Sequence, residues 1–244
     1  MIIQTASVSI HFKPITDIKR RYYNCDKVLE GEFQEPTMLP VPDNAYQDYP
    51  RIIVMSNNGH SQLTLTMATA TLSVNFNAGY EYDWGKCGEY ISQKVGVVEQ
   101  FLHDLGVDGY TYAGLMSTVL FDEIKEGTVE YVKNKLLSPF TNFNEDTLEE
   151  LVLKYTFVRN HTYYVNLQVQ NARIFPADAN PMNAGDFSES NLENEFVGVV
   201  IDINDRYQFN NNEKYRAGKE MLKKLVDEMG NVLDNDIRGF LGVD

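Results

Sequence analysis

The N-terminal stretch of the chain alternates between apolar and polar residues. The apolar positions are Ala6, Val8, Ile10 and Phe12, and Ser or His stands between them. A period of two is typical of a strand with one buried face. Pro14 ends this strand or places it at an edge. His11 falls on the polar face, so we expect it to be solvated rather than catalytic.

Residues 19–49 follow with no clear period. Four prolines (Pro36, Pro40, Pro42 and Pro50) predict an extended loop over the surface. The run Lys19–Arg21 is interpreted as a solvated turn rather than a phosphate site. A loop of this length is more often functional than a short one.

The clearest pattern lies between residues 50 and 105. Three apolar or alternating runs, 51–56, 63–67 and 72–76, are joined by short turns at 57–59 and 68–70. Short connections of this kind predict an antiparallel meander. From Cys87 to Leu105 the apolar residues recur every three or four positions, which predicts an amphipathic helix packed on the meander, with Gly106 as its C-terminal cap.

The second half repeats this order with insertions. We predict strands at 110–121, 151–157, 163–169 and 197–203, with a turn at Asn160–His161 and a polar loop over 176–194. Short helices are predicted at 128–137 and from Asn144. A final helix follows residues 210–212, and its apolar stripe holds Leu222, Leu225, Met229 and Val232.

These elements predict an α+β fold in which antiparallel meanders carry long amphipathic helices on one face. The order of elements also indicates a duplicated unit of four strands and one helix. The two halves would be 1–106 and 107–244, with a single compact domain as the alternative.

Charge and composition narrow the function. The formal net charge is −14 and the pI is about 4.7, which argues against broad binding to the nucleic-acid backbone. An acidic mimic of nucleic acid stays open as an alternative. Cys25 and Cys87 match no metal or redox spacing. No apolar run approaches the length of a membrane span, so a cytoplasmic protein with no membrane partner is expected.

Four acids are the candidates for catalysis. Asp202 and Asp205 follow the last predicted strand, and Asp122 and Glu123 follow an earlier one. Paired carboxylates at strand ends can hold a divalent cation, so a metal-dependent nuclease or hydrolase is one hypothesis. The plainer interpretation is that these acids solubilise or cap. No nucleophile elbow, phosphate loop or dinucleotide fingerprint occurs, and neither a resident metal nor a cofactor is expected.

An aromatic acidic loop is the candidate for binding. It comprises Tyr80, Glu81, Tyr82, Asp83 and Trp84. Tyr and Trp are frequent anchors in interfaces. The alternative is that Trp84 fills the space between the meander and its helix. We therefore expect a non-enzymatic protein that binds another protein, or itself as a homo-oligomer, through sheet edges, loops or a groove.

The chain resembles a sporadically distributed bacterial family of uncharacterised proteins of about 250 residues. The resemblance is carried by short runs spread along the chain, which are residues 7–12, Tyr82-Asp83-Trp84, Tyr112-Ala113-Gly114-Leu115, Val200-Ile201-Asp202-Ile203 and Phe240. The segment after Leu115 departs from the family pattern because an expected Arg/Tyr/Asn run is missing. The resemblance implies an accessory role linked to mobile elements or phage defence, and it implies no catalytic residue.

Overall fold

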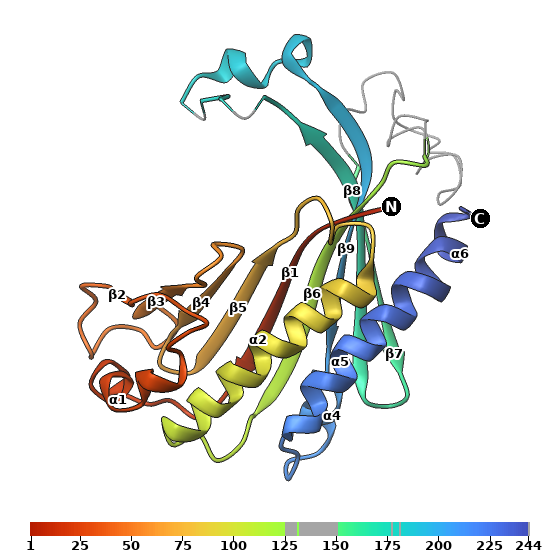
Figure 1. Ribbon diagram of the computed structural model, residues 1–244. Helices are drawn as coiled ribbons and strands as arrows, with labels where there is room; N and C mark the ends of the chain where they lie inside the picture. The colour runs from red at the N-terminus through yellow and green to blue at the C-terminus, as the bar shows by residue number, and fades with distance from the viewer. Residues whose placement is uncertain (125–130, 132–150, 177, 181, 244) are drawn as a thin grey trace.

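A computed structural model shows one antiparallel sheet running through both predicted halves (Figure 1). The structure describes residues 1–124, 131, 151–176, 178–180 and 182–243. The nine strands lie in the order β2-β3-β4-β5-β1-β6-β9-β8-β7, and every neighbouring pair is antiparallel. The prediction of a mixed fold with an antiparallel sheet is thus confirmed.

The strands occupy the following residues: β1 Ile2–His11, β2 Thr37–Met38, β3 Ile52–Met55, β4 Ser61–Leu65, β5 Thr69–Asn75, β6 Tyr112–Phe121, β7 Leu153–Arg159, β8 Tyr163–Ile174 and β9 Asn194–Asn204. The helical elements are α1 Ile18–Cys25, η1 Asp26–Val28, α2 Trp84–Asp104, η3 Ala184–Phe187, η4 Glu189–Asn191, α4 Arg206–Asn211, α5 Lys219–Asn231, the π-helical turn η5 Val232–Asp236 and α6 Ile237–Leu241.

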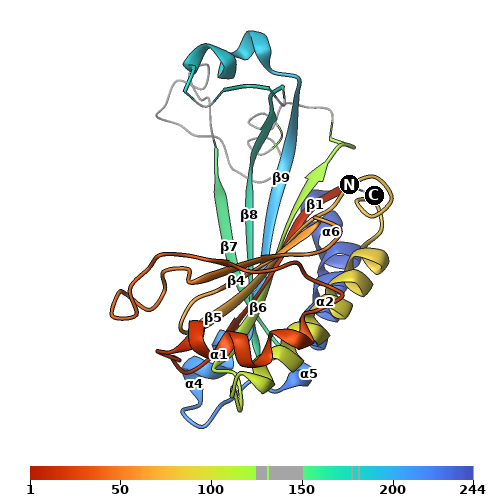
Figure 2. The ribbon, with the colours of Figure 1, turned by 60° about the vertical axis from the view of Figure 1, so that its left-hand side comes forward.

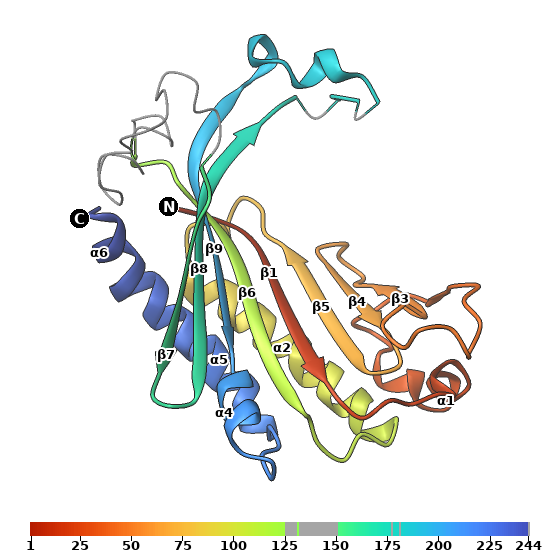
Figure 3. The same cartoon turned by 180° about the vertical axis from the view of Figure 1, so that it is seen from behind.

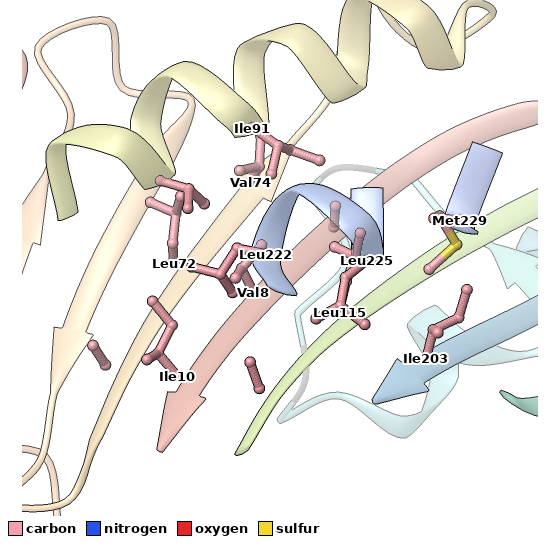
Figure 4. Packing of buried hydrophobic residues seen from close by; sticks show 14 of the residues in the cluster. Val8, Ile10, Leu72, Val74, Ile91, Leu115, Ile203, Leu222, Leu225 and Met229 are labelled. Carbon is pink, nitrogen blue, oxygen red and sulfur yellow. The ribbon is translucent and has the colours of Figure 1, made fainter. Parts of the chain in front are cut away.

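Helices α2 and α5 lie side by side on one face of the sheet (Figures 1 and 3). Their apolar stripes meet the inward half of the alternating strands, as Ile91 beside Val74 and Leu225 beside Leu115 illustrate (Figure 4). These side chains belong to one buried cluster that draws on both halves of the chain. Burial of apolar area at roughly 25 cal/mol per Å² makes this layer the main source of stability.

The opposite face of the sheet carries no helix along its length among the described residues (Figure 3). Strands β8 and β9 extend beyond their neighbours, and the connection between them holds η3 and η4 at the far end (Figure 2). The opposite end of the same face is bordered by α4, which contacts β6 and β8. The sheet therefore presents one open face bounded at both ends.

Both ends of helix α2 are capped, and only the C-terminal cap was predicted from the sequence. The Asp83 side chain accepts a hydrogen bond from the Lys86 amide at 3.2 Å. Gly106 takes a φ of +94°, and its amide donates to the His103 carbonyl at 3.0 Å. Gly106 thus ends the helix in the left-handed conformation that was expected of it, directly after the C-cap residue Leu105, and the helix begins at Trp84 rather than at Cys87.

Trp84 joins α2 to α5. Its indole Nε1 donates to the Val226 carbonyl at 3.3 Å. A Cβ at Gly230 would lie 3.0 Å from Trp84 Cδ1, and the nearest neighbour of a Cβ at Gly88 is a Val226 methyl group at 3.0 Å. Two glycines therefore let the helices approach closely, and Trp84 fills the seam between them rather than the space between meander and helix.

The segment predicted as a featureless loop contains a helix. Lys19, Arg20 and Arg21 lie in α1, not in a turn. Arg20 and Arg21 pair with Asp17, and Lys19 Nζ donates to the carbonyls of Leu39 and Val41 at 2.7 Å each. The proline-rich loop is thus tied to α1 by a single ammonium group. The prediction was wrong because the apolar stripe of α1 holds only Ile18, Tyr22 and Cys25, and three positions are too short a run to stand out in the sequence.

Smaller differences concern element boundaries. The turn placed at 68–70 lies earlier, because Thr66 and Thr69 close it and β5 already begins at Thr69. The helix expected after residues 210–212 starts at Lys219, and the short α4 precedes it. Asn160 and His161 form the expected turn, with φ of 53° and 49°. The predicted helices at 128–137 and from Asn144 lie outside the described residues, apart from Tyr131.

Among the helices that the structure describes, none combines the length and the apolar character needed to cross a bilayer.

Candidate binding face

The open face of the sheet is built from three rows of side chains that cross it from strand to strand. Each row follows the pairing register, and its members point away from α2 and α5 because strand side chains alternate. From β3 to β7, row one is Ile53, Thr64, Thr71, Ser9, Gly114, Asn204, Tyr164 and Val158. In the same direction, row two is Met55, Gln62, Ser73, Ser7, Met116, Asp202, Asn166 and Thr156. Row three runs from β5 to β7 and is Asn75, Thr5, Thr118, Val200, Gln168 and Lys154.

Charge is nearly absent from these rows. Only Asp202 and Lys154 are charged, although 23% of the whole chain is Asp, Glu, Lys or Arg. Hydroxyl and amide side chains fill most of the remaining positions, and Met116 stands at the centre with 44% of its surface exposed. A solvated sheet face ordinarily carries charges, whereas the centre of a protein interface is depleted of them.

Asp202 is held in place by amides on both sides. Asn166 Nδ2 donates to its carboxylate at 3.0 Å, and Asn204 Nδ2 donates at 3.1 Å. Asn166 in turn accepts a hydrogen bond from the Thr156 hydroxyl at 2.8 Å. The network fixes the orientation of these side chains across β7, β8 and β9, so this part of the face is pre-organised for directional hydrogen bonds.

An aromatic cluster closes the α4 end of the face. The rings of His11 and Tyr112 stack at 4.1 Å, and Thr69 Oγ1 lies 3.2 Å from His11 Nδ1. Arg206 and Phe209 of α4 each lie 5.5 Å from the Tyr112 ring. Burial, and then the charge of Arg206, lower the pKa of His11. His11 is therefore neutral near pH 7, and it is packed rather than freely solvated as predicted.

An apolar hollow of about 420 Å³ lies at the other end of the face. Ile2, Leu120, Ile174 and Phe196 line it, and Glu81 stands among the lining residues. Leu120 is buried although it points to the open side, and it stands opposite Gly198 of β9. The hollow is lined by both halves of the chain and by the long β8–β9 hairpin, and it can accept an apolar side chain of a partner.

The side chains of the predicted aromatic loop have different local partners, and its role in binding stays a prediction. Tyr80 packs edge-on against Tyr90, Asp83 caps α2 and Trp84 fills the helix seam. Tyr82 is 67% exposed. Only Glu81 reaches the end of the open face, where it lines the hollow.

The four candidate acids are not brought together. Asp205 is fully buried and accepts hydrogen bonds from the Ala113 amide at 2.7 Å and the Tyr215 hydroxyl at 2.5 Å. Asp122 and Glu123 lie past the other end of β6, about 30 Å away along a strand that rises roughly 3.3 Å per residue.

The local partners of these acids indicate structural roles. Asp122 and Glu123 pair with the Met1 amino group at 2.6 and 3.0 Å, and Glu123 also pairs with Arg238. Burial raises the pKa of Asp205 despite its two donors. The described residues contain no group of three or more His, Cys, Asp or Glu side chains placed to hold a metal ion. The arrangement thus gives the metal-dependent hypothesis no shared site.

The open face was not predicted as a site, although a signal for it exists in the sequence. In β1 and β5 the polar half of the alternation is Ser, Thr, Asn or His, with no Lys or Glu. A strand that is only solvated has no reason to exclude charge in so acidic a chain. The choice of neutral polar residues, and not the alternation itself, was the informative feature.

Comparison with known proteins adds no family assignment. A scan against models of known protein families finds no match, and no curated protein matches the chain at a significant level.

Proposed function

We propose that this chain is a non-catalytic binding protein that holds another protein against the open face of its sheet. The observation that carries the proposal is the charge-depleted face defined by the three rows, on a chain with a net charge of −14. The centre of a protein–protein interface is typically poor in charged residues and keeps Met and aromatic residues.

The charge pattern also defines the partner. Its contact surface would be neutral, with amide and hydroxyl groups that complement Asn204, Asn166 and Gln168, and with an apolar side chain for the hollow beside Leu120. Basic residues around that surface would be attracted to the acidic remainder of the chain and would raise the association rate. A nucleic acid fits poorly, because the face offers few cations for its phosphates.

The proposal includes an internal duplication. In the first half, β3-β4-β5 form a meander and β5 pairs with β1; in the second, β7-β8-β9 form a meander and β9 pairs with β6. Helix α2 follows β5, and after the short α4, α5 follows β9. The central pair β1–β6 would then lie on the approximate two-fold axis, and the rows of the open face would be shared equally between two copies of one unit.

The cellular role follows from the family resemblance. We propose that the chain is an accessory protein of a mobile-element or phage-defence module, in which the open face recruits a component of the same module. A cytoplasmic location is part of this proposal.

Site-specific photo-cross-linking in the native host tests the proposed face. A photoreactive residue replaces Met116 at the centre of the open face or, as the control, Ser92 on the exposed side of α2. We expect the position at 116 to yield one discrete protein adduct and the position at 92 to yield none. The matched substitutions Ser73→Arg and Ser92→Arg then separate the two faces.

The arginine on the open face should reduce the adduct about tenfold or more, as loss of a central interface contact does, and the arginine on α2 should leave it unchanged. Equal capture from both positions, or an adduct at 116 that survives Ser73→Arg, would refute the proposal.

A further inference from the structure

The two edges of the sheet are protected very differently. At one edge, β2 has only two residues and stands between Pro36 and Pro40. At the other edge, β7 has seven residues and no proline. Among the described residues, no strand pairs with the outer side of β7. Short strands and prolines are the usual means of blocking edge-to-edge association, and β7 has neither.

The β7 edge is also apolar for an exposed strand. Phe157 and Val158 are 45% and 48% exposed, and Val152 just before the strand is 46% exposed. Tyr155 and Phe157 lie parallel on the helix side with their rings 6.4 Å apart, and Tyr155 packs edge-on against Phe240 of α6. An exposed edge of this length and composition is an association surface.

The sequence of β7 complements itself when two copies run antiparallel. With Thr156 on the two-fold axis, Thr156 faces Thr156 of the second copy, Tyr155 faces Phe157, and Lys154 faces Val158. Thr–Thr and aromatic pairs are among the favourable cross-strand pairs, and no like charges stand opposite each other in this register. The four aromatic rings of the two strands would form one cluster beside the helices.

We propose that two copies of this chain associate through antiparallel pairing of their β7 edges, with Thr156 on the two-fold axis. The sheet then continues from one copy into the other, and the open faces of both copies form one extended surface. Such an interface is isologous and closes at two subunits. The pairing rests on the edge and its sequence, and it holds whether or not the open face binds a partner.

Sedimentation of the whole chain tests the association. A pair of seven-residue strands buries less than a standard interface, so we expect a reversible dimer with a Kd within about 1 µM to 1 mM. A chain that stays monomeric throughout this range would overturn the proposal.

Charge placed at position 158 tests the register. Val158→Lys would put two Lys–Lys pairs into the dimer, whereas Val158→Glu would put two Lys–Glu pairs there. We expect the first to weaken and the second to strengthen dimerisation, each by roughly two- to thirtyfold. The double variant Lys154→Glu/Val158→Lys should restore the dimer. Equal effects of Lys and Glu at 158 would contradict this register.

Engineered cysteines give a direct test of proximity. Thr156→Cys would face its own copy across the axis, whereas Ser73→Cys lies on the open face away from the edge. Because Cys25 and Cys87 are both buried, the introduced thiol is the accessible one in the described part of the chain. We expect mild oxidation to link Thr156→Cys into a covalent dimer and to leave Ser73→Cys monomeric. Equal linking of the two variants, or none in either, would overturn the pairing.

Discussion

Three helical glycines allow a sharp test of how the two long helices are joined. Gly96 lies on the exposed side of α2, and a Cβ there would meet nothing within 4 Å. Gly230 of α5 is buried, and a Cβ there would lie 3.0 Å from Trp84 Cδ1 and 3.1 Å from Nε1. Gly88 of α2 is crowded in the same way, because a Cβ there would lie 3.0 Å from a methyl group of the β-branched Val226. The same substitution, Gly→Ala, should therefore stabilise the protein at Gly96 and bring no gain at Gly230.

The magnitudes follow from two competing terms. Replacing a helical Gly by Ala favours the helix by about 1 kcal/mol, so Gly96→Ala should raise the free energy of unfolding by about that amount. At Gly230 the same gain is opposed by overpacking against the indole, which costs about 1–3 kcal/mol. Because the Val226 carbonyl and the two helices hold Trp84 in place, the net change should lie between about zero and a loss of 2 kcal/mol.

Equilibrium unfolding in urea, followed by far-UV circular dichroism, measures each change. The Trp84→Leu background supplies the control, because there Gly230→Ala should regain its helix-forming benefit. The coupling between positions 84 and 230 should then be about 1–3 kcal/mol. If Gly230→Ala stabilises the Trp84 protein as much as Gly96→Ala does, the close approach at the seam is refuted.

Three further predictions concern buried charges. Burial raises the pKa of Asp205, so this group binds a proton more tightly in the folded state than in the unfolded state. Its contribution to stability therefore falls as pH rises above about 4. Asp205→Asn should remove that fall from a plot of the urea midpoint against pH. Arg51 is fully buried and donates to the carbonyls of Ala45, Tyr46 and Tyr49. Arg51→Met should therefore lower the free energy of unfolding by about 1–3 kcal/mol and speed limited proteolysis between residues 42 and 50. An unchanged cleavage pattern would count against Arg51 as the residue that holds this loop. Lys94→Met breaks the 2.5 Å ion pair with Glu32. The loss in the free energy of unfolding should be limited to about 1–3 kcal/mol, because Glu32 is half-exposed and can be rehydrated. Thermal unfolding measures this loss, with Glu32→Gln as the matched variant.

The sequence predicts the elements better than their arrangement. The strands of the opening meander and the stripe from Cys87 to Leu105 could be recognised because period two and period 3.6 are local properties. The short helix α1 was missed because its apolar stripe has only three positions, Ile18, Tyr22 and Cys25, which is too few to establish a period. Pairing of β1 with β6, across more than a hundred residues, leaves no local trace.

The candidate binding site, like the fold, depends on strand pairing that the sequence does not show. Tyr80–Trp84 look like one patch in the sequence, but a cap, a helix seam and an edge-on ring pair draw their side chains apart. Conversely, Ser7, Met116 and Asp202 are far apart in the chain and are neighbours on the open face only through the register. Side-chain convergence across strands depends on pairing, and pairing is what the sequence alone does not give.

Trp84 also has an optical consequence, because it is the one tryptophan of the chain. Its indole lies where α2 of the first half meets α5 of the second. Tryptophan emission, excited where tyrosine does not absorb, therefore reports on that junction alone, whereas far-UV circular dichroism reports on helices and strands everywhere. If the emission maximum shifts to longer wavelength at a lower urea concentration than the dichroism signal is lost, the contact between α2 and α5 opens while the helices and strands persist.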